Sequence, residues 1–337
     1  MTSDASRTLR RVPVRSGVAR PGAPDQPPAE RIPRSRTRHS RWLLARRHWR
    51  MYAFVLPGLI FFVVFAYVPM LGNVAAFQDY SPFLGFANSP WVGLENFARL
   101  ISDPDVGHAV INTLQLSLLQ IIFAFPAPIA LALLLNSLIS TRVKRWLQSV
   151  VYLPHFISWV IVISIWQQIL GGTGVVSDLL GRIGFDHVNI MSNPETFQLL
   201  VTSQVIWKDS GWGTIIFFAA LTTIPTELYE SAAVDGAGAW RRIVHVTLPG
   251  LLPVILLLLI LRLGDVLTVG FEQIYLQYNT VGADAAEVLD TFVYFRGVIG
   301  SDWGFSTAVG LVKGVVGTLL VLGANSLSKR FGAEGLF

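Results

Sequence analysis

Five charged side chains fall within stretches that are otherwise long and apolar. They are Lys208, Asp209, Arg262, Asp265 and Lys313. A basic side chain at the centre of a bilayer costs roughly 2.5–3.5 kcal/mol to insert, so it pairs with an acid or faces a water-filled cavity. Arg262 and Asp265 are three residues apart and can neutralise each other on one helix face. Lys313 has no acid within four positions, which favours a cavity.

The three cations together would attract a carboxylate, which predicts an acidic ligand. Each cation could instead meet an acid on a partner subunit. Aromatic and amide side chains gather in the same region, and these bind sugar rings and hydroxyl groups. They are Gln204, Trp207, Trp212, Glu272, Gln273, Tyr275, Tyr278 and Asn279. Trp and Tyr also collect at membrane interfaces whatever their function, so a structural role stays open for each.

From these two groups we predict a substrate path. Its residues are Gln204, Trp207, Lys208, Arg262, Asp265, Glu272, Gln273, Tyr275 and Lys313. A catalytic site is not predicted, because the chain has no G-x-x-x-x-G-K-[ST] loop and its six histidines lack metal-ligand spacing. Without cysteine, it has no thiolate ligand or nucleophile either. We expect a protein with no catalytic site, metal or cofactor of its own.

The elements that must position these residues are membrane helices. The chain of 337 residues is 52% hydrophobic and 14% charged, and apolar runs of about 20 residues can cross a bilayer. We therefore predict an all-α, polytopic membrane protein. Its six spans are expected near residues 52–72, 112–136, 150–170, 198–221, 250–270 and 305–327.

Basic residues predict the orientation. Residues 1–51 hold 13 basic and 3 acidic side chains, and the loops after the second and fourth spans are also basic. The other three loops carry one basic residue each against 4, 3 and 5 acidic residues. The positive-inside rule then places both termini and the loop at 222–249 in the cytoplasm. We expect residues 1–50 to be a basic, disordered tail and residues 51–337 to form the membrane domain.

The cytoplasmic loop at 222–249 is polar and rich in alanine and glycine. Pro225 suits a helix start, and Gly236 allows a positive φ at a bend between two short helices. Trp240 could anchor the second helix against the spans, and Pro249 marks the break before the fifth span. Composition alone would equally allow an ordinary amphipathic connector.

The spacing in this loop resembles the EAA loop of permease subunits in ABC importers. The matching residues are Glu230, Ala232, Asp235, Gly236, Ala237, Leu248 and Pro249, while Ser231 replaces a common alanine and Ile243 a common phenylalanine. The resemblance implies a coupling helix that docks on a cytoplasmic ATPase. Its predicted contact residues are Glu230, Ala232, Ala233, Asp235, Gly236 and Ala237.

Other segments resemble the complex-oligosaccharide branch of these permeases, which includes aldouronate, lipoprotein-linked and alginate importers of the MalF-like superfamily. They include Leu56–Phe62, Phe125–Asn136, Tyr152–Trp159 and Leu261–Gly264. The resemblance implies import of an oligosaccharide by ATP-driven alternating access across the bacterial inner membrane. It also implies a second, different permease, two ATPase subunits that hold ATP and Mg²⁺, and an extracytoplasmic solute-binding protein.

Two alternatives stay open at this point. An ion-coupled secondary transporter would show inverted repeats with broken helices, and no clear repeat is seen. A membrane-embedded polysaccharide-assembly protein would carry a cluster of acids or a metal set at one membrane face, which the sequence does not show. Nucleic acid is not expected as a partner, because the basic tail lacks interleaved aromatic residues.

Overall fold

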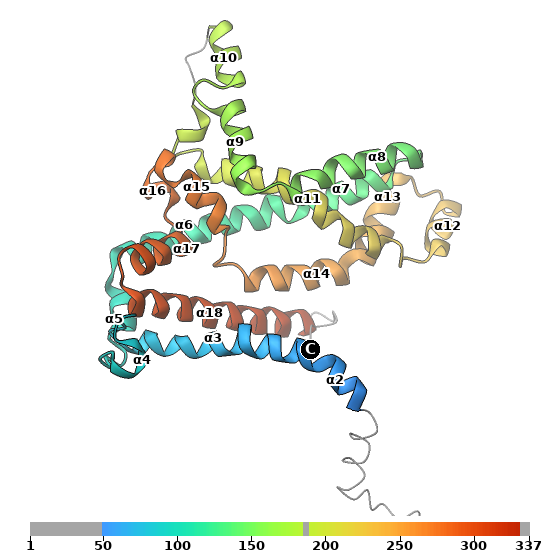
Figure 1. Ribbon diagram of the computed structural model, residues 1–337. Coiled ribbons are helices and arrows are strands. Elements are labelled where there is room, and N and C mark those ends of the chain that lie inside the picture. Colours follow the sequence, from blue (N-terminus) through green and yellow to red (C-terminus); the bar gives the residue numbers. More distant parts are fainter. Residues whose placement is uncertain (1–48, 185–188, 331–337) are drawn as a thin grey trace, which may run out of the picture. The chain divides into compact units, whose positions relative to one another are not determined.

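The computed structural model describes residues 49–184 and 189–330, and these are almost entirely helical (Figure 1). Their only β-contact is an isolated antiparallel bridge between Gln78 and Trp91. The predicted all-α class is therefore confirmed. All but the last two residues of the predicted tail, 1–50, lie outside the described residues. The chain divides into two compact units, residues 1–63 and 64–337, which are considered separately.

In the first unit, the described part is α2 (Trp49–Phe62), an apolar helix that contains Pro57 and has no buried residue. The second unit holds all the other helices. In its first part these are α3 (Val68–Met70), α4 (Gly85–Asn88), α5 (Glu95–Ser102), α6 (Pro104–Leu119), α7 (Pro126–Asn136), α8 (Thr141–Tyr152), α9 (Trp159–Leu170) and α10 (Val175–Arg182). The later ones are α11 (Phe197–Leu221), α12 (Thr226–Val234), α13 (Ala239–Arg242), α14 (Leu248–Gly264), α15 (Phe271–Val281), α16 (Ala283–Ala286), α17 (Leu289–Val293) and α18 (Trp303–Arg330).

Short π-helical and 3-10 turns join several of these helices into longer rods. π-Helical turns lie at Val63–Tyr67, Gln120–Ala124, Ile243–Thr247 and Tyr294–Ile299, and 3-10 turns at Leu71–Phe77, Leu153–Phe156 and Ile190–Ser192. Because of these junctions, α6 and α7 form one continuous rod, as do α13 and α14.

Five rods among the described residues are long and apolar enough to cross a membrane. They are Trp49–Phe77, Pro104–Asn136, Trp159–Arg182, Ala239–Gly264 and Trp303–Arg330. Each overlaps one of the six predicted spans. The remaining predicted span, 198–221, is matched by α11, a helix of 25 residues. Its length is sufficient to cross a bilayer, but its polar residues make it less apolar than the other five.

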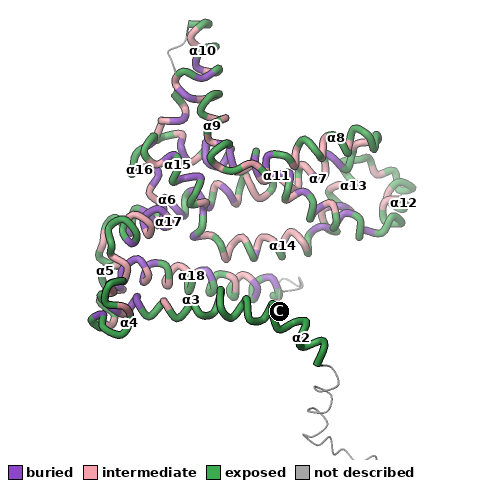
Figure 2. The backbone as a smooth tube through the Cα atoms, viewed as in Figure 1, coloured by how far each residue is buried: buried purple, intermediate pink, exposed green. Residues whose placement is uncertain are grey.

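The burial pattern explains why α11 can be polar. Twelve of its residues are buried, including Gln204, Lys208 and Thr214 (Figure 2). It packs most extensively against α7 and also contacts α6, α8, α14 and α15. A helix surrounded by protein can carry polar groups at membrane depth, provided that its neighbours satisfy them.

The third predicted span, 150–170, is wrong at its start. The structure places a separate amphipathic helix, α8, before it, then a 3-10 turn at Leu153–Phe156, and α9 begins only at Trp159. The fifth span, predicted to reach 270, ends at Gly264. An irregular segment, residues 265–270, then leads into α15, where Gly270 has a φ of 105°. The second interruption contributes lining residues to the cavity described next, and the first ends at Trp159, which is another lining residue.

Candidate functional site: a polar cavity and a coupling segment

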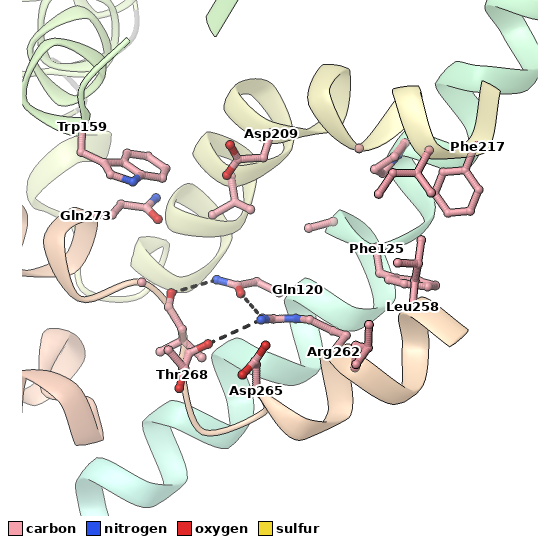
Figure 3. A pocket seen from close by; sticks show the side chains of 18 residues that line it. Gln120, Phe125, Trp159, Asp209, Phe217, Leu258, Arg262, Asp265, Thr268 and Gln273 are labelled. Carbon is pink, nitrogen blue, oxygen red and sulfur yellow. Dashed lines mark hydrogen bonds between the residues drawn. The ribbon is translucent and has the colours of Figure 1, made fainter. Parts of the chain in front are cut away.

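A cavity of about 530 Å³ lies among α7, α9, α11, α14 and the irregular segment before α15 (Figure 3). Its polar lining residues are Gln120, Asp209, Arg262, Asp265, Thr268 and Gln273, and its aromatic ones are Phe125, Trp159 and Phe217. Cavities of this size with aromatic walls and a few polar groups suit small organic ligands. Of the predicted path residues, the structure brings Arg262, Asp265 and Gln273 to this cavity.

Arg262 is held by oxygen atoms of neighbouring segments. Its Nη2 donates to Gln120 Oε1 at 2.5 Å, and its Nη1 donates to the carbonyl oxygen of Thr268 at 3.5 Å. Gln120 Nε2 in turn donates to the carbonyl oxygen of Val269 at 3.3 Å. This network joins the rod of α6 and α7 to the end of α14 and fixes the irregular segment at the cavity wall.

The ion pair that the sequence allows between Arg262 and Asp265 is not formed in the structure. Asp265 is the first residue beyond α14, with φ −95° and ψ 16°, so the helical i, i+3 geometry does not apply to it. Within the described part of the chain, no ion pair joins the two side chains. Arg262 therefore contributes a positive charge to the lining, and Asp265 lies exposed beside it (Figure 3).

Lys208, predicted to line the path, is turned away from the cavity. Its side chain is buried, and Nζ donates to the carbonyl oxygens of His155 and Ile157 at 2.7 Å each and of Pro154 at 3.4 Å. The ammonium group also lies 5.4 Å from the ring centroid of Trp159. Sequence reasoning found no partner for this lysine, because its acceptors are backbone groups more than fifty positions away.

Lys313 was expected to be unpaired, and this is wrong. Its Nζ bonds to Asp290 of α17, 23 positions earlier in the chain. Both side chains are about one-fifth exposed, and Asp290 Oδ2 is buried without a protein partner. Lys313 also borders a second cavity of about 520 Å³ between α14 and α18, where Asp265 is another lining residue.

Gln204 lies in a buried cluster of amides with Gln273 and Gln277. Gln204 and Gln277 exchange two hydrogen bonds of 3.1 Å, and Gln273 Nε2 donates to Gln204 Oε1 at 2.7 Å. The cluster ties α11 to α15, and only Gln273 reaches the lining of the first cavity. Gln204 therefore supports the wall from behind.

The remaining predicted path residues lie elsewhere in the second unit. Trp207 is 40% exposed and meets Trp166 edge to face, while Glu272 is exposed on α15. Tyr275 packs among Phe271, Tyr294 and Phe295. Sequence reasoning missed Gln120 and Trp159 as lining residues. An amide within the second predicted span was the available signal for Gln120.

Asp209, next to Lys208 on α11, does line the first cavity. It lies 2.9 Å from His155 Nδ1, and the His155 ring stacks on Trp212 with centroids 4.6 Å apart. The lining thus contains one guanidinium group and two carboxylates, one of them beside a histidine. The sequence predicted a path with three cations beside Asp265 and Glu272, and of these five charged residues the lining contains only Arg262 and Asp265.

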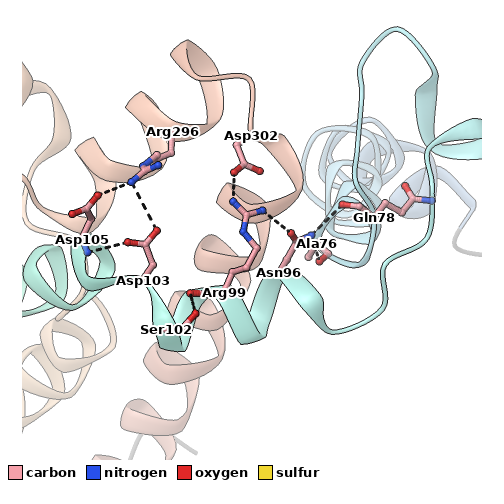
Figure 4. Close-up of polar contacts among 9 residues, drawn as sticks. All are labelled: Ala76, Gln78, Asn96, Arg99, Ser102, Asp103, Asp105, Arg296 and Asp302. Atoms are coloured by element: carbon pink, nitrogen blue, oxygen red, sulfur yellow. Dashed lines mark hydrogen bonds and ion pairs between the residues drawn. The ribbon is translucent and has the colours of Figure 1, made fainter.

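A second group of charged residues connects the segments around α5, α17 and α18 (Figure 4). Arg99 bonds Asp302 at 2.6 Å, and Arg296 bonds Asp105 at 2.6 Å and lies 3.8 Å from Asp103. The bond to Asp302 raises the pKa of Arg99. These ion pairs lie in the loops that the sequence predicts to be external, and they join residues about two hundred positions apart.

The coupling segment predicted at 222–249 forms two short helices, α12 and α13, joined by a tight bend. Gly236 has a φ of 73°, as the sequence predicted. The Ala237 N–H donates to the Ala232 carbonyl at 2.8 Å and the Gly236 N–H to the Ala233 carbonyl at 3.1 Å. This pair of bonds is the Schellman motif, which caps a helix that ends at glycine. Pro225 lies at the N-cap, one residue before α12.

Much of this segment is open to solvent. Glu230, Ala233, Asp235 and Gly236 are exposed, and Ala232 and Ala237 are partly exposed. Trp240 was expected to pack against the spans, but it is 75% exposed. Val234, at the end of α12, is 89% exposed. Large apolar side chains that stand free beside small residues are typical of a docking surface.

A family comparison gives the fold its context. Residues 124–332 match the family described as the binding-protein-dependent transport system inner membrane component. The chain belongs to this family. The match covers more than half of the chain and includes the cavity-lining residues from Ala124 onward and the coupling segment.

Curated relatives and solved structures are consistent with this family assignment. The chain is 45% identical over 299 residues to Protein LplB of Bacillus subtilis (strain 168), covering 88% of this chain and 94% of the relative. It is 46% identical over 288 residues to the polygalacturonan/rhamnogalacturonan transport system permease protein YteP of the same organism, covering 85% and 90%. A bacterial alginate ABC transporter, solved in complex with an alginate pentasaccharide-bound periplasmic protein, matches with a TM-score of 0.80 and 40% identity, covering 88% of this chain and 99% of that chain.

The predicted family is therefore confirmed. The chain is a permease subunit of a binding-protein-dependent sugar ABC importer, and five of its described helices are long and apolar enough to cross a membrane. Membership of this family excludes the two alternatives that the sequence left open, an ion-coupled secondary transporter and a polysaccharide-assembly protein.

Proposed function

We propose that this permease imports an acidic oligosaccharide, of the uronate class that alginate and aldouronate represent. The similarity to the alginate transporter over 88% of the chain, with 40% identity and a TM-score of 0.80, carries the proposal. Arg262 supports it from within the cavity, since a guanidinium group binds a carboxylate through two parallel hydrogen bonds. Trp159 and Phe125 offer apolar ring faces to a sugar.

Asp209 and Asp265 fit this proposal because their charges weaken the binding of a uronate. A purely cationic cavity would hold a uronate too tightly for release, and a carrier must bind its cargo only briefly. The two carboxylates lower the net charge of the lining and accept hydrogen bonds from sugar hydroxyl groups. The proposed path through this subunit therefore contains Arg262, Asp265, Gln273 and Asp209, together with Trp159.

The proposed mechanism is alternating access. A solute-binding protein delivers the oligosaccharide, and two ATPase subunits that hold ATP and Mg²⁺ close on each other. Their movement pushes α12 through Glu230, Ala232, Ala233, Asp235, Gly236 and Ala237. This chain and a second, different permease then rock between inward-open and outward-open states. We infer that the coupling segment transmits force and does not touch the sugar.

The same proposal places both termini and α12 in the cytoplasm and residues 271–304 outside. The chain has no cysteine, so single cysteines can report the topology. We expect an impermeant thiol reagent, added outside intact cells, to label Asp284→Cys and not Ser231→Cys. Both positions are exposed. The opposite labelling pattern would contradict the orientation and the coupling role together.

Uptake by the reconstituted complex tests the substrate class. With uronate and neutral oligosaccharides of equal length, Arg262→Gln should reduce uronate uptake about tenfold more than neutral uptake, as loss of one charged hydrogen bond implies. Arg182→Gln, an exposed arginine outside the cavity, is the matched control. Equal loss of both sugars, or transport of neutral sugars alone by the unaltered protein, would contradict the acidic-substrate proposal.

A further inference from the structure

Residues near the middle of α11 contact the interruption between α8 and α9, residues 153–158. The chain leaves α8 at Tyr152, makes a 3-10 turn, and continues through the extended residues Ile157 and Ser158 into α9. Lys208 occupies the twelfth position of the 25 in α11, close to its midpoint. If α11 crosses the membrane, as its length allows, this interruption lies at membrane depth. Water is scarce there, and an unpaired carbonyl group costs several kcal/mol.

Lys208 satisfies these carbonyl groups. An ammonium group has three N–H donors and no acceptor, and the three acceptors around Nζ are the carbonyl oxygens of Pro154, His155 and Ile157. Every donor of the side chain is thereby engaged. Lys208 is 7% exposed, so a passing carboxylate has neither a free donor nor an open approach to it.

Neighbouring contacts hold the same interruption from other sides. Asp209 contacts the His155 ring, whose face stacks on Trp212, and Phe156 meets Trp212 edge to face at 5.7 Å. A Cβ atom at Gly211 would overlap the carbonyl oxygen of Val151, so α8 ends directly against the α11 backbone. One helical turn of α11 thus contacts the interruption through a cation, an anion, an aromatic ring and a bare glycine.

The first residue after the interruption is Trp159, which lines the cavity. Its position depends on the backbone that Lys208 holds, and the ammonium group also lies over its ring. We propose that Lys208 is a positioning residue, which fixes Trp159 at the cavity wall through the backbone of residues 154–157. Trp159 is then the residue that contacts the sugar, as an apolar face for a pyranose ring. This inference rests on the proposed function for its transport measurements only.

The reactivity of introduced cysteines tests, without any substrate, whether Lys208 holds the backbone of residues 154–157. Val162 is fully buried on α9 and Thr202 is 2% exposed on α11, so Val162→Cys and Thr202→Cys should both resist a thiol reagent in the assembled complex. Adding Lys208→Met should raise the labelling rate of Val162→Cys about tenfold and leave that of Thr202→Cys unchanged. No change at Val162→Cys, or an equal rise at both positions, would overturn the proposal.

Transport distinguishes positioning from direct contact with the sugar. Lys208→Met should raise KM by a similar factor for uronate and neutral oligosaccharides, because the cation does not meet the carboxylate. Trp159→Leu should raise KM likewise, and the double variant should be little worse than either single variant, because both changes remove the same ring face. A larger loss for uronate, or multiplication of the two effects in the double variant, would overturn the proposal.

Lys208→Arg provides the test if Lys208→Met does not assemble. It keeps the positive charge, but a planar guanidinium group cannot direct three N–H groups from one nitrogen atom. We expect labelling of Val162→Cys to rise in this variant also, although less than in Lys208→Met. Full protection and unaltered KM would show that three N–H groups on one nitrogen atom are not required, and the role proposed for Lys208 would be rejected. Failure of the unaltered complex to take up any oligosaccharide would contradict the proposed function and leave the labelling result standing.

Discussion

Two interruptions of helix in the second unit are built in opposite ways. At Gly236, between α12 and α13, the backbone satisfies itself through bonds to Ala232 and Ala233, a few positions earlier. Between α8 and α9, the carbonyl oxygens of Pro154, His155 and Ile157 accept hydrogen bonds from Lys208, which belongs to another helix. The first lies on an exposed surface, whereas these three residues of the second are buried or partly buried and contact the buried Lys208.

The difference follows from the surroundings. In water, a local turn needs only a residue that tolerates a positive φ, because solvent satisfies whatever the turn leaves open. Within a helical bundle, every open carbonyl group needs a donor from the protein. The exposed bend is therefore local and can serve as a detachable contact for a partner. The covered one couples two helices and is expected to move with them as a unit.

The largest effect should come from the exposed bend. Gly236→Leu places a side chain in the left-handed region, which costs about 1–2 kcal/mol, and adds bulk to the proposed docking surface. We expect the complex to insert and assemble, while sugar-stimulated ATPase activity falls at least tenfold. Glu230→Lys, which reverses a charge on the same surface, should act in the same direction.

Gly236→Asn separates strain from bulk, since asparagine tolerates the left-handed region better than other residues. It should retain more stimulated activity than Gly236→Leu. A mutation at an exposed position of the same loop that lies before α12, Thr222→Ala, serves as the control. Normal stimulation in both Gly236→Leu and Glu230→Lys would remove the coupling role from α12.

A smaller effect is expected where a long-range pair is covered by other helices. Lys313→Met leaves Asp290 without its partner, and an unpaired buried charge costs about 3 kcal/mol. We expect the melting temperature of the purified complex to fall by about 5–10 °C. Adding Asp290→Asn removes the unpaired charge and should restore most of the loss.

Uptake separates this structural role from a place in the substrate path. The structural pair predicts that Lys313→Met lowers the yield of complex but affects uronate and neutral sugars equally. Failure of Asp290→Asn to restore stability, or a loss confined to uronate, would contradict the structural role and return Lys313 to the substrate path.

The contrast between local and long-range contacts also explains which features could be predicted from the sequence. The bend at Gly236 was predictable because a glycine next to a helix end has a local meaning, and the six spans were predictable because apolar length is also local. The partners of Lys208 and Lys313 were not predictable. They lie between 23 and 54 positions away, and those of Lys208 are carbonyl groups, which every residue carries. No side-chain pattern marks them.

The candidate cavity was predictable only in part for a similar reason. Arg262, Asp265 and Gln273 attracted notice as polar groups in or near apolar spans. Whether Arg262 pairs with Asp265 was not predictable, because it depends on where α14 ends, at Gly264 and not at 270. Helix ends are the least certain feature of a sequence-based prediction, and here six residues decide whether Asp265 shares a helix face with Arg262.

The smallest effect should come from a half-buried carboxyl group in the predicted external loops. Burial raises the pKa of Glu287 above 4.5, its ordinary value, and Asp105 adds to the rise. His108, Arg296 and the Tyr278 hydroxyl group oppose it. Burial, with the charge of Glu287 second, also raises the pKa of Tyr278 to about 12. The loop therefore carries a carboxyl group that is easier to ionise in the unfolded chain than in the folded one.

Because folding raises the pKa of Glu287, the direction in which stability changes with pH follows. Below pH 4.5 Glu287 is protonated in both states and costs nothing, but stability is lost as the pH rises from there through the folded-state pKa. Glu287→Gln stays neutral and still accepts from Tyr278, so it should raise the melting temperature at pH 7.5 by about 1–2 °C. The gain should shrink toward zero near pH 4. A gain for Glu287→Gln that is constant with pH, or a loss at pH 7.5, would mean that the carboxylate is stabilised by its neighbours, and the loop would then resemble the ion pairs of Arg99 and Arg296.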